Sequence, residues 1–106
     1  MNDETNPAFL CERVVDRIAW SIVSACTGIG CTMSDETRDA KDAAMTAWVW
    51  GARFTRGTEA LDVRVDATWR HDYIHVEFTC LDALGKRVHG LNETNVAEYF
   101  ATDVQS

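Results

Sequence analysis

The first long stretch of the chain has the hydrophobic periodicity of an amphipathic helix. Apolar residues recur every four positions: Leu10, Val14, Ile18 and Ile22. A second row widens this stripe: Cys11, Val15, Ala19 and Cys26. Charged residues occupy the opposite side, as a helix facing both a core and solvent requires. Asn6 is a favourable N-cap before Pro7, and glycines follow at positions 28 and 30. The pattern predicts a helix that begins at Pro7 and ends near Cys26.

The next segment has the signals of a second helix. Ser34 is an N-cap candidate, and Asp35 and Glu36 follow it where the helix dipole favours anions. Small residues then share one helical face: Ala40, Ala43, Ala44 and Ala47. We expect a helix over residues 34–45 followed by a strand, because aromatic residues alternate with others from Trp48 onward. The alanine-rich composition leaves open a helix that continues to Gly51.

Period-two alternation dominates the second half of the chain and predicts antiparallel strands. Residues 48–55, 61–70 and 73–80 alternate in this way, and His71-Asp72 forms a tight turn between the last two. A turn over residues 82–85 and a short strand through Val88 follow. Asn92 then caps a short helix with Val96, Tyr99 and Phe100 on one side. Short connections between consecutive strands indicate a meander.

These elements predict one α+β domain over residues 1–106. Two N-terminal helices pack on one face of a four-stranded antiparallel meander, and a short helix ends the chain. We expect Trp20 on the first helix to meet a layer of three tryptophans, Trp48, Trp50 and Trp69. The expected core comprises Leu10, Val14, Ile18, Trp50, Val63, Val65, Trp69, Ile74, Val76 and Phe78.

Charge narrows the classes of partner more than composition does. The chain has 106 residues, with 17 acidic against 10 basic side chains and a net charge of -7. Nucleic acids and anionic membranes need clustered cations, so we expect neither as a partner. No apolar run approaches the length of a membrane span, and Met1 to Asn6 lack the basic residues of a secretory signal. We therefore expect a cytoplasmic protein that binds a basic protein.

The four cysteines leave more than one interpretation open. Cys11 and Cys80 fall on predicted apolar faces, where a free thiol behaves as a small hydrophobe. Reduced thiols in a cytosol are the favoured interpretation. Cys26 and Cys31 flank a glycine-containing loop, so a disulfide between them is an alternative, and a metal role is a weaker one.

No complete set of catalytic or metal-binding residues is found in the sequence. His71 and His75 share strand parity with Glu77, but residues four apart on a strand stand about 13 Å apart, too far for one metal ion. The segment Thr27 to Gly30 follows a predicted helix and is best explained as a helix stop. We predict no catalytic residues, no metal and no cofactor.

The acidic residues are the best candidates for a binding surface. On the predicted second helix, Asp35, Asp39 and Asp42 share a face, with Glu36 beside them. This group is interpreted either as a solvated face or as a patch that docks on a basic protein. Asp62 and Asp66 on the exposed strand face complete the predicted partner-binding set, although alternating arginines favour ion pairing there.

The sequence thus favours a non-catalytic inhibitor of a basic, nucleic-acid-handling protein. Small acidic single-domain proteins of this kind include phage anti-defence proteins such as anti-CRISPR proteins, and the analogy rests on size and charge alone. A toxin-neutralising immunity protein is an alternative. Another is a small-molecule-binding or enzymatic α+β cone with a Trp-lined pocket. A homodimer stays open.

Overall fold

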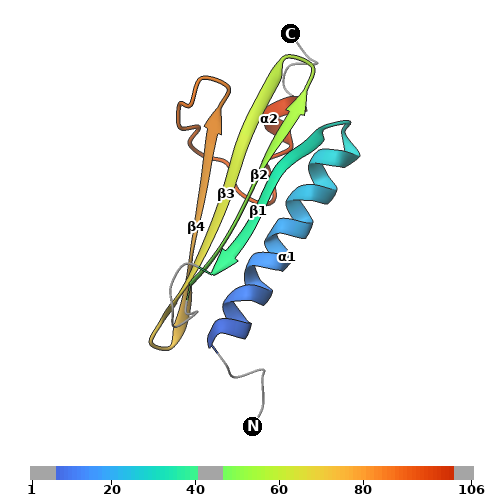
Figure 1. Ribbon diagram of the computed structural model, residues 1–106. Coiled ribbons are helices and arrows are strands. Elements are labelled where there is room, and N and C mark those ends of the chain that lie inside the picture. The colour runs from blue at the N-terminus through green and yellow to red at the C-terminus, as the bar shows by residue number, and fades with distance from the viewer. Residues whose placement is uncertain (1–6, 41–46, 102–106) are drawn as a thin grey trace.

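A computed structural model describes residues 7–40 and 47–101 of the chain (Figure 1). The elements follow in the order α1 (Pro7–Gly28), β1 (Thr32–Ala40), β2 (Ala47–Arg56), β3 (Glu59–Arg70), β4 (Tyr73–Asp82) and α2 (Glu98–Ala101). The strands form one antiparallel sheet in the order β1-β2-β3-β4. The predicted α+β class and antiparallel meander are confirmed, with a single long helix on the sheet.

Helix α1 begins and ends close to its predicted limits. At its C-terminus, the N–H groups of Ile29 and Cys31 both donate to the carbonyl of Cys26, and Gly30 adopts a φ of 96°. The fully buried stripe is Cys11, Val15, Ala19, Ile22 and Cys26. Of the row expected at its centre, Leu10, Val14 and Ile18 are only half-buried, whereas Ile22 is fully buried. The helix is therefore rotated by about one residue from the predicted orientation.

The predicted second helix over residues 34–45 is wrong for the part that the structure describes. Residues 32–40 form strand β1, which pairs with β2 in a register that places Met33 opposite Phe54 and Ala40 opposite Trp48. The register shifts between Ser34 and Thr37, and Asp35 between them has a left-handed φ of 55°. That backbone conformation is incompatible with the first turn of a right-handed helix. Residues 41–46 lie outside the described part.

Strands β2, β3 and β4 confirm the period-two interpretation and pair without interruption. The expected short strand through Val88 is wrong as a member of the sheet, because residues 86–88 make only an isolated bridge from Arg87 to Leu81. The sheet still has the predicted four strands, because residues 32–40 form a strand that was not predicted. The meander is thus shifted by one strand toward the N-terminus.

The core lies between α1 and the inner face of the sheet. Its largest fully buried side chains include Trp50, Phe54 and Leu61, and Val63 and Val65 lie beside them. The other expected core residues of the sheet are less buried than predicted. Trp69, Ile74 and Phe78 are half-buried, and Val76 is 38% exposed.

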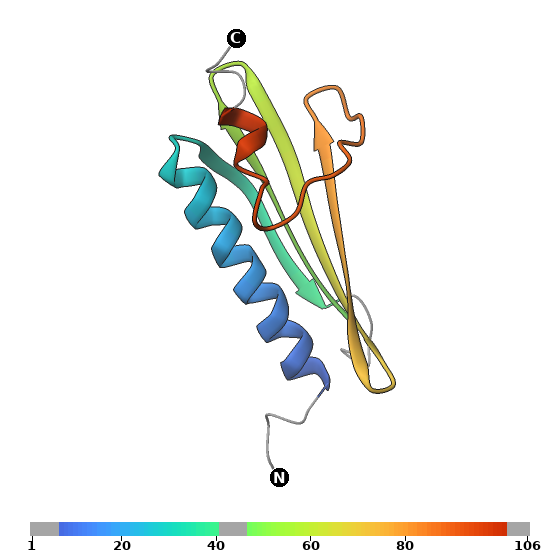
Figure 2. The ribbon, with the colours of Figure 1, turned by 180° about the vertical axis from the view of Figure 1, so that it is seen from behind.

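The C-terminal segment closes one end of this layer. The Asn92 side chain accepts hydrogen bonds from the backbone of Thr94 and Asn95. It caps the turn over residues 93–97 and not the predicted helix, because α2 begins only at Glu98. Val96 and Phe100 are buried in the same core as α1. The segment crosses the face of the sheet that carries α1 (Figure 2). It covers only one end of the space beside the helix.

Candidate partner-binding surface

A groove of about 370 Å³ runs between α1 and β1. Its described lining residues are Asp16, Ala19, Trp20, Val23, Met33, Glu36 and Arg38. Three of the helical residues, Asp16, Trp20 and Val23, follow spacings of four and three and therefore share one flank of α1. The groove thus combines an aromatic and aliphatic wall with a charged one.

The charged wall is a chain of side-chain contacts from the helix to the sheet. Arg38 Nη1 lies 3.0 Å from Asp16 Oδ1 on α1, and Arg38 Nη2 lies 3.9 Å from Glu36 Oε2. The same Glu36 oxygen accepts a hydrogen bond of 2.8 Å from Trp50 Nε1. Because Trp50 is fully buried, Glu36 supplies the partner that its indole N–H needs. Arg38 therefore connects β1 to α1, and Glu36 connects β1 to β2.

Trp20 is the most unusual residue of the apolar wall. Its side chain is 73% exposed, although large aromatic side chains are usually mostly buried. The expected contact with Trp48, Trp50 and Trp69 is wrong, because Trp20 lies on the β1 flank of the helix. The sequence predicted a contact with that layer, and its position four residues after Asp16 on a helix was the signal for this flank.

The structure separates the acidic residues that the sequence grouped. Asp35 and Asp39 are exposed on β1, and Asp39 Oδ1 accepts a hydrogen bond from the backbone N–H of Ala40. Glu36 accepts a hydrogen bond from Trp50 and lies beside Arg38. Asp42 lies outside the described residues. The expected shared helical face for Asp35, Asp39 and Asp42 is wrong, because Asp35 and Asp39 belong to a strand.

Asp62 and Asp66 lie on the other face of the sheet, away from α1, and both are in ion pairs. Asp62 receives two hydrogen bonds from Arg53, of 2.8 and 3.1 Å, and this contact raises the pKa of the Arg53 guanidinium. Asp66 receives two from Arg64, of 2.9 and 3.2 Å. These bidentate pairs support the ion-pairing interpretation and leave the two carboxylates less available to a partner.

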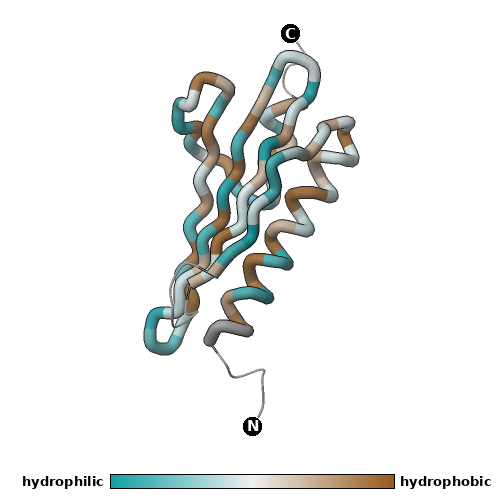
Figure 3. The backbone as a smooth tube through the Cα atoms, in the orientation of Figure 1, coloured by the Kyte–Doolittle hydropathy of each residue, from teal (hydrophilic) through white to brown (hydrophobic). Residues whose placement is uncertain are grey.

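The net negative charge comes from outside the central part of the sheet. Residues 47–91 contain six acidic and six basic side chains, so they are neutral overall. The surplus of acidic residues belongs to residues 1–40 and 92–106. Within the described part, β1 is the strand where hydrophilic residues run together (Figure 3). β1 therefore carries exposed carboxylates along the edge of the sheet. Asp39 is aligned through Val49 with Asp66, so it lies on the face of the sheet away from the groove.

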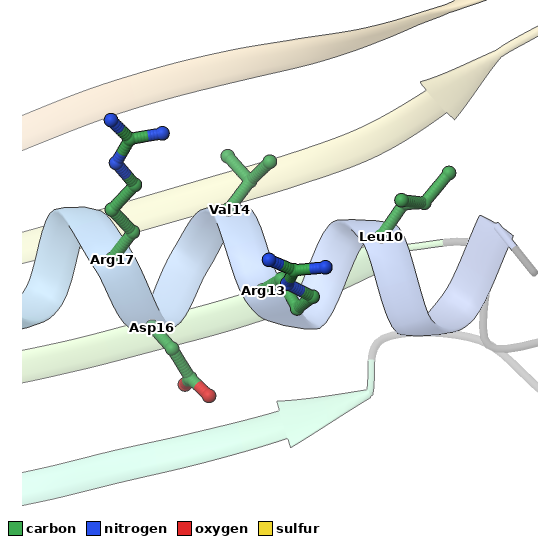
Figure 4. A pocket seen from close by; sticks show the side chains of 5 residues that line it. All are labelled: Leu10, Arg13, Val14, Asp16 and Arg17. Carbon is green, nitrogen blue, oxygen red and sulfur yellow. The ribbon is translucent and has the colours of Figure 1, made fainter. Parts of the chain in front are cut away.

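The other grooves border the opposite flank of α1 or its N-terminal half. One of about 480 Å³ is lined by Leu10, Arg13, Val14, Asp16 and Arg17. Figure 4 shows that Leu10, Val14 and Arg17 point to one side of the helix and Asp16 to the other. These side chains do not converge on a common point, so the shape is that of a helix surface and not of a closed ligand site.

The tryptophans expected to border a ligand pocket are part of the core or pack against it. Trp50 is fully buried and its ring lies 6.4 Å from that of Phe54. Trp48 and Trp69 pack against the same cluster, and the Trp48 Nε1 atom is buried without a hydrogen-bond partner among the described residues. The three described grooves do not include these tryptophans in their lining.

The four cysteines are free and buried. Burial raises the pKa of Cys26 and of Cys80 to about 12, so both thiols are protonated and poorly nucleophilic at neutral pH. In the part of the chain that the structure describes, no group of three His, Cys, Asp or Glu side chains is placed to hold a metal ion.

Within residues 7–40 and 47–101, no helix is long and apolar enough to cross a membrane. Comparison of the chain with protein-family models, with curated proteins and with solved structures finds no match. The functional argument therefore rests on the geometry of the surface alone.

Proposed function

We propose that this protein is a non-catalytic binding module that inhibits a basic, nucleic-acid-handling protein. The partner docks at the groove between α1 and β1. The observation that carries the proposal is Trp20, which is 73% exposed in the wall of this groove, next to a strand with exposed carboxylates.

Tryptophan side chains such as that of Trp20 often supply much of the binding energy of a protein interface. Tryptophan is enriched among interface residues whose truncation costs most, because it buries a large rigid surface. Val23 and Met33 extend the apolar wall beside Trp20. A partner segment that places one apolar side chain in the groove and reaches around edge strand β1 with Lys or Arg matches this surface, since its cations then meet the exposed Asp35 and Asp39.

The structure changes which of the predicted acidic residues support this proposal. Glu36, Asp62 and Asp66 already have cationic or hydrogen-bond partners within the chain, so we assign the steering of a basic partner to Asp35 and Asp39. Exposed carboxylates of this kind mainly accelerate association.

The most specific form of the proposal is a phage anti-defence protein such as an anti-CRISPR protein, in the cytoplasm. Small size, acidity and an exposed aromatic anchor suit the occupation of a groove that normally holds nucleic acid. A toxin-neutralising immunity protein would use the same surface, so the identity of the basic partner separates the two. A Trp-lined small-molecule pocket receives no support from the buried position of Trp50.

The test has a cellular and a biophysical part. Bacteria with an active CRISPR–Cas system against a phage express the chain, and plaques are counted; an inhibitor restores phage growth. The effector complex is then purified and binding is measured by surface plasmon resonance. Trp20→Ala should weaken binding by about 30-fold or more, the effect of losing one dominant interface residue. Asp35→Lys/Asp39→Lys should slow association most at low salt.

Leu84→Ala is the matched control, because Leu84 is 89% exposed and lies in the turn after β4. It should bind like the wild-type chain. Unchanged binding of the Trp20→Ala variant would exclude the groove. Restored phage growth without a direct complex would contradict a binding inhibitor.

A further inference from the structure

Strand β4 is the second edge of the sheet, and only part of it is covered. The N–H of Val88 donates to the carbonyl of Cys80 over 2.9 Å, and the N–H of Asp82 donates to the carbonyl of Lys86 over 2.8 Å. Residues 86–88 thus occupy the edge at the C-terminal end of β4. Among the described residues, none pairs with the outer edge of residues 73–79.

The direction of the free backbone groups on this edge follows from the same hydrogen bonds. In an antiparallel ladder, successive residues point their N–H and C=O groups alternately toward one neighbour strand and the other. Cys80 and Asp82 point theirs outward, as their bonds to residues 86–88 show. By this alternation, Ile74, Val76 and Phe78 also present theirs outward. The free edge therefore offers donors and acceptors at every second residue.

The side chains of this free edge are those of a pairing strand. Val76 is 38% exposed and Tyr73 is 58% exposed, and β4 pairs with β3 without a bulge. Exposed edges are usually protected by charges, bulges or prolines. Glu77 is the only Asp, Glu, Lys or Arg among residues 73–79. The segment thus lacks most of the devices that prevent strand addition.

One antiparallel pairing of this edge with the same edge of a second copy matches both its free backbone groups and its side chains. Val76 is the midpoint of residues 73–79, so a two-fold axis at Val76 uses the whole free segment. It places Val76 opposite the Val76 of a second copy and Ile74 opposite Phe78, all on the face that carries α1. It also places His75 opposite Glu77, on the other face. His75 Nε2 already lies 3.7 Å from Glu77 Oε1 within one chain.

Other registers are less favourable. A shift of one residue would put the apolar face of one copy against the polar face of the other. A symmetric pairing centred on Glu77 would place two carboxylates directly opposite, which is destabilising. A pairing centred on His75 would bring Phe78 against Asp72 of the turn. The side-chain sequence therefore selects the register centred on Val76.

We propose that two copies of this chain form a symmetric dimer by antiparallel pairing of residues 73–79 of β4, with Val76 on the two-fold axis. The two sheets then form one continuous sheet with both α1 helices on the same face. The half-buried Ile74 and Phe78 of each copy gain apolar neighbours from the other. The α1–β1 grooves lie at the two outer edges, so this dimer is independent of the proposed function.

The association is measured by sedimentation velocity from about 1 µM to about 1 mM chain. We expect a concentration-dependent species of twice the 11.9 kDa monomer. Val76→Lys should raise the dimer dissociation constant by about 100-fold or more, because it places two ammonium groups opposite each other. Leu84→Lys adds the same charge at another exposed apolar residue and should leave the dimer unchanged.

A charge exchange tests the register itself. His75→Glu should weaken the dimer, because each new carboxylate faces Glu77 of the other copy. The double variant His75→Glu/Glu77→Lys should restore it, because opposite charges then face each other twice. Circular dichroism confirms that every variant is folded. A wild-type chain that is monomeric throughout, a dimeric Val76→Lys variant or a failed rescue would each overturn the proposal.

Discussion

The two edge strands of the sheet solve the problem of an exposed backbone in opposite ways. β1 carries charged residues, a register shift and the left-handed Asp35, and the ion pair of Arg38 with Asp16 binds it to α1. β4 is regular, less charged along residues 73–79, and partly apolar on the face that α1 leaves open. The first edge is protected against further strands, whereas the second has the features of an interface.

This difference follows from where α1 lies. The helix packs against β1, β2 and β3, so apolar side chains there are buried and even polar β1 is held by ion pairs. Beyond β3, the inner face of the sheet extends past the helix. Val76 and Phe78 lie there and keep part of their surface in solvent. One helix on a four-stranded sheet therefore leaves one covered edge and one open edge.

The largest expected difference between the covered and the open part of the sheet is the loss of unfolding free energy when a phenylalanine is truncated. Phe54→Ala should lower the free energy of unfolding by about 3–5 kcal/mol, because Phe54 is fully buried under α1. Phe78→Ala should cost only about 1–2 kcal/mol, because its side chain is half-buried. Urea denaturation at a chain concentration that keeps the protein monomeric measures both.

Phe54→Leu serves as the second variant if Phe54→Ala does not fold. It should cost less than about 1.5 kcal/mol, since it largely conserves volume. Equal losses for Phe54→Ala and Phe78→Ala would mean that α1, or a residue range outside the described part, covers β4 as fully as β2.

The sequence predicted the covered half of the molecule well. The stripe of α1 and the alternation in β2, β3 and β4 arise from burial against one core, and burial is what periodicity records. Residues 34–40 were wrongly predicted as a helix for the same reason, because burial is what produces a readable pattern. Residues 32–40 are mostly exposed, so their side chains carry no alternation, and Ser34 with Asp35 and Glu36 imitates a helix N-terminus.

The candidate site could be predicted only in part. Acidity near residues 35–39 was visible in the sequence, but the role of each carboxylate depends on partners distant along the chain. Glu36 bonds to Trp50, which is 14 residues away, and Asp62 pairs with Arg53, which lies opposite it on the neighbouring strand β2. The exposure of Trp20 depends on a rotation of α1 by about one residue, which a stripe two rows wide does not determine.

Substitutions of Glu36 and Asp39 test whether the side chains of β1 stabilise this edge of the sheet. Glu36→Ala should cost about 1–3 kcal/mol, because it leaves the buried Trp50 N–H without its acceptor. Glu36→Gln keeps an acceptor oxygen and should cost less. Asp39→Ala should stay within about 0.5 kcal/mol, because Asp39 is exposed and bonds only its neighbour's backbone N–H among the described contacts. Thermal and urea unfolding compare the three.

A loss for Asp39→Ala as large as that for Glu36→Ala would show that general charge, and not the bond to Trp50, stabilises β1. The near-ultraviolet circular dichroism of the indoles gives an independent measure. It should change for Glu36→Ala and stay constant for Asp39→Ala, because only Glu36 contacts a tryptophan N–H.

The smallest expected effect concerns the backbone of the protected edge. Asp35 lies in the shifted part of β1 with a φ of 55°, where β-branched residues are strongly disfavoured and glycine is not. Asp35→Val should therefore destabilise the fold by about 1–2 kcal/mol, whereas Asp35→Gly should be neutral or slightly stabilising. Both variants remove the same carboxylate, so their difference in unfolding free energy isolates the backbone from the charge. Equal stabilities would mean that β1 pairs regularly through residue 35. The edge would then be protected by its charges alone, and the contrast with β4 would reduce to side-chain chemistry.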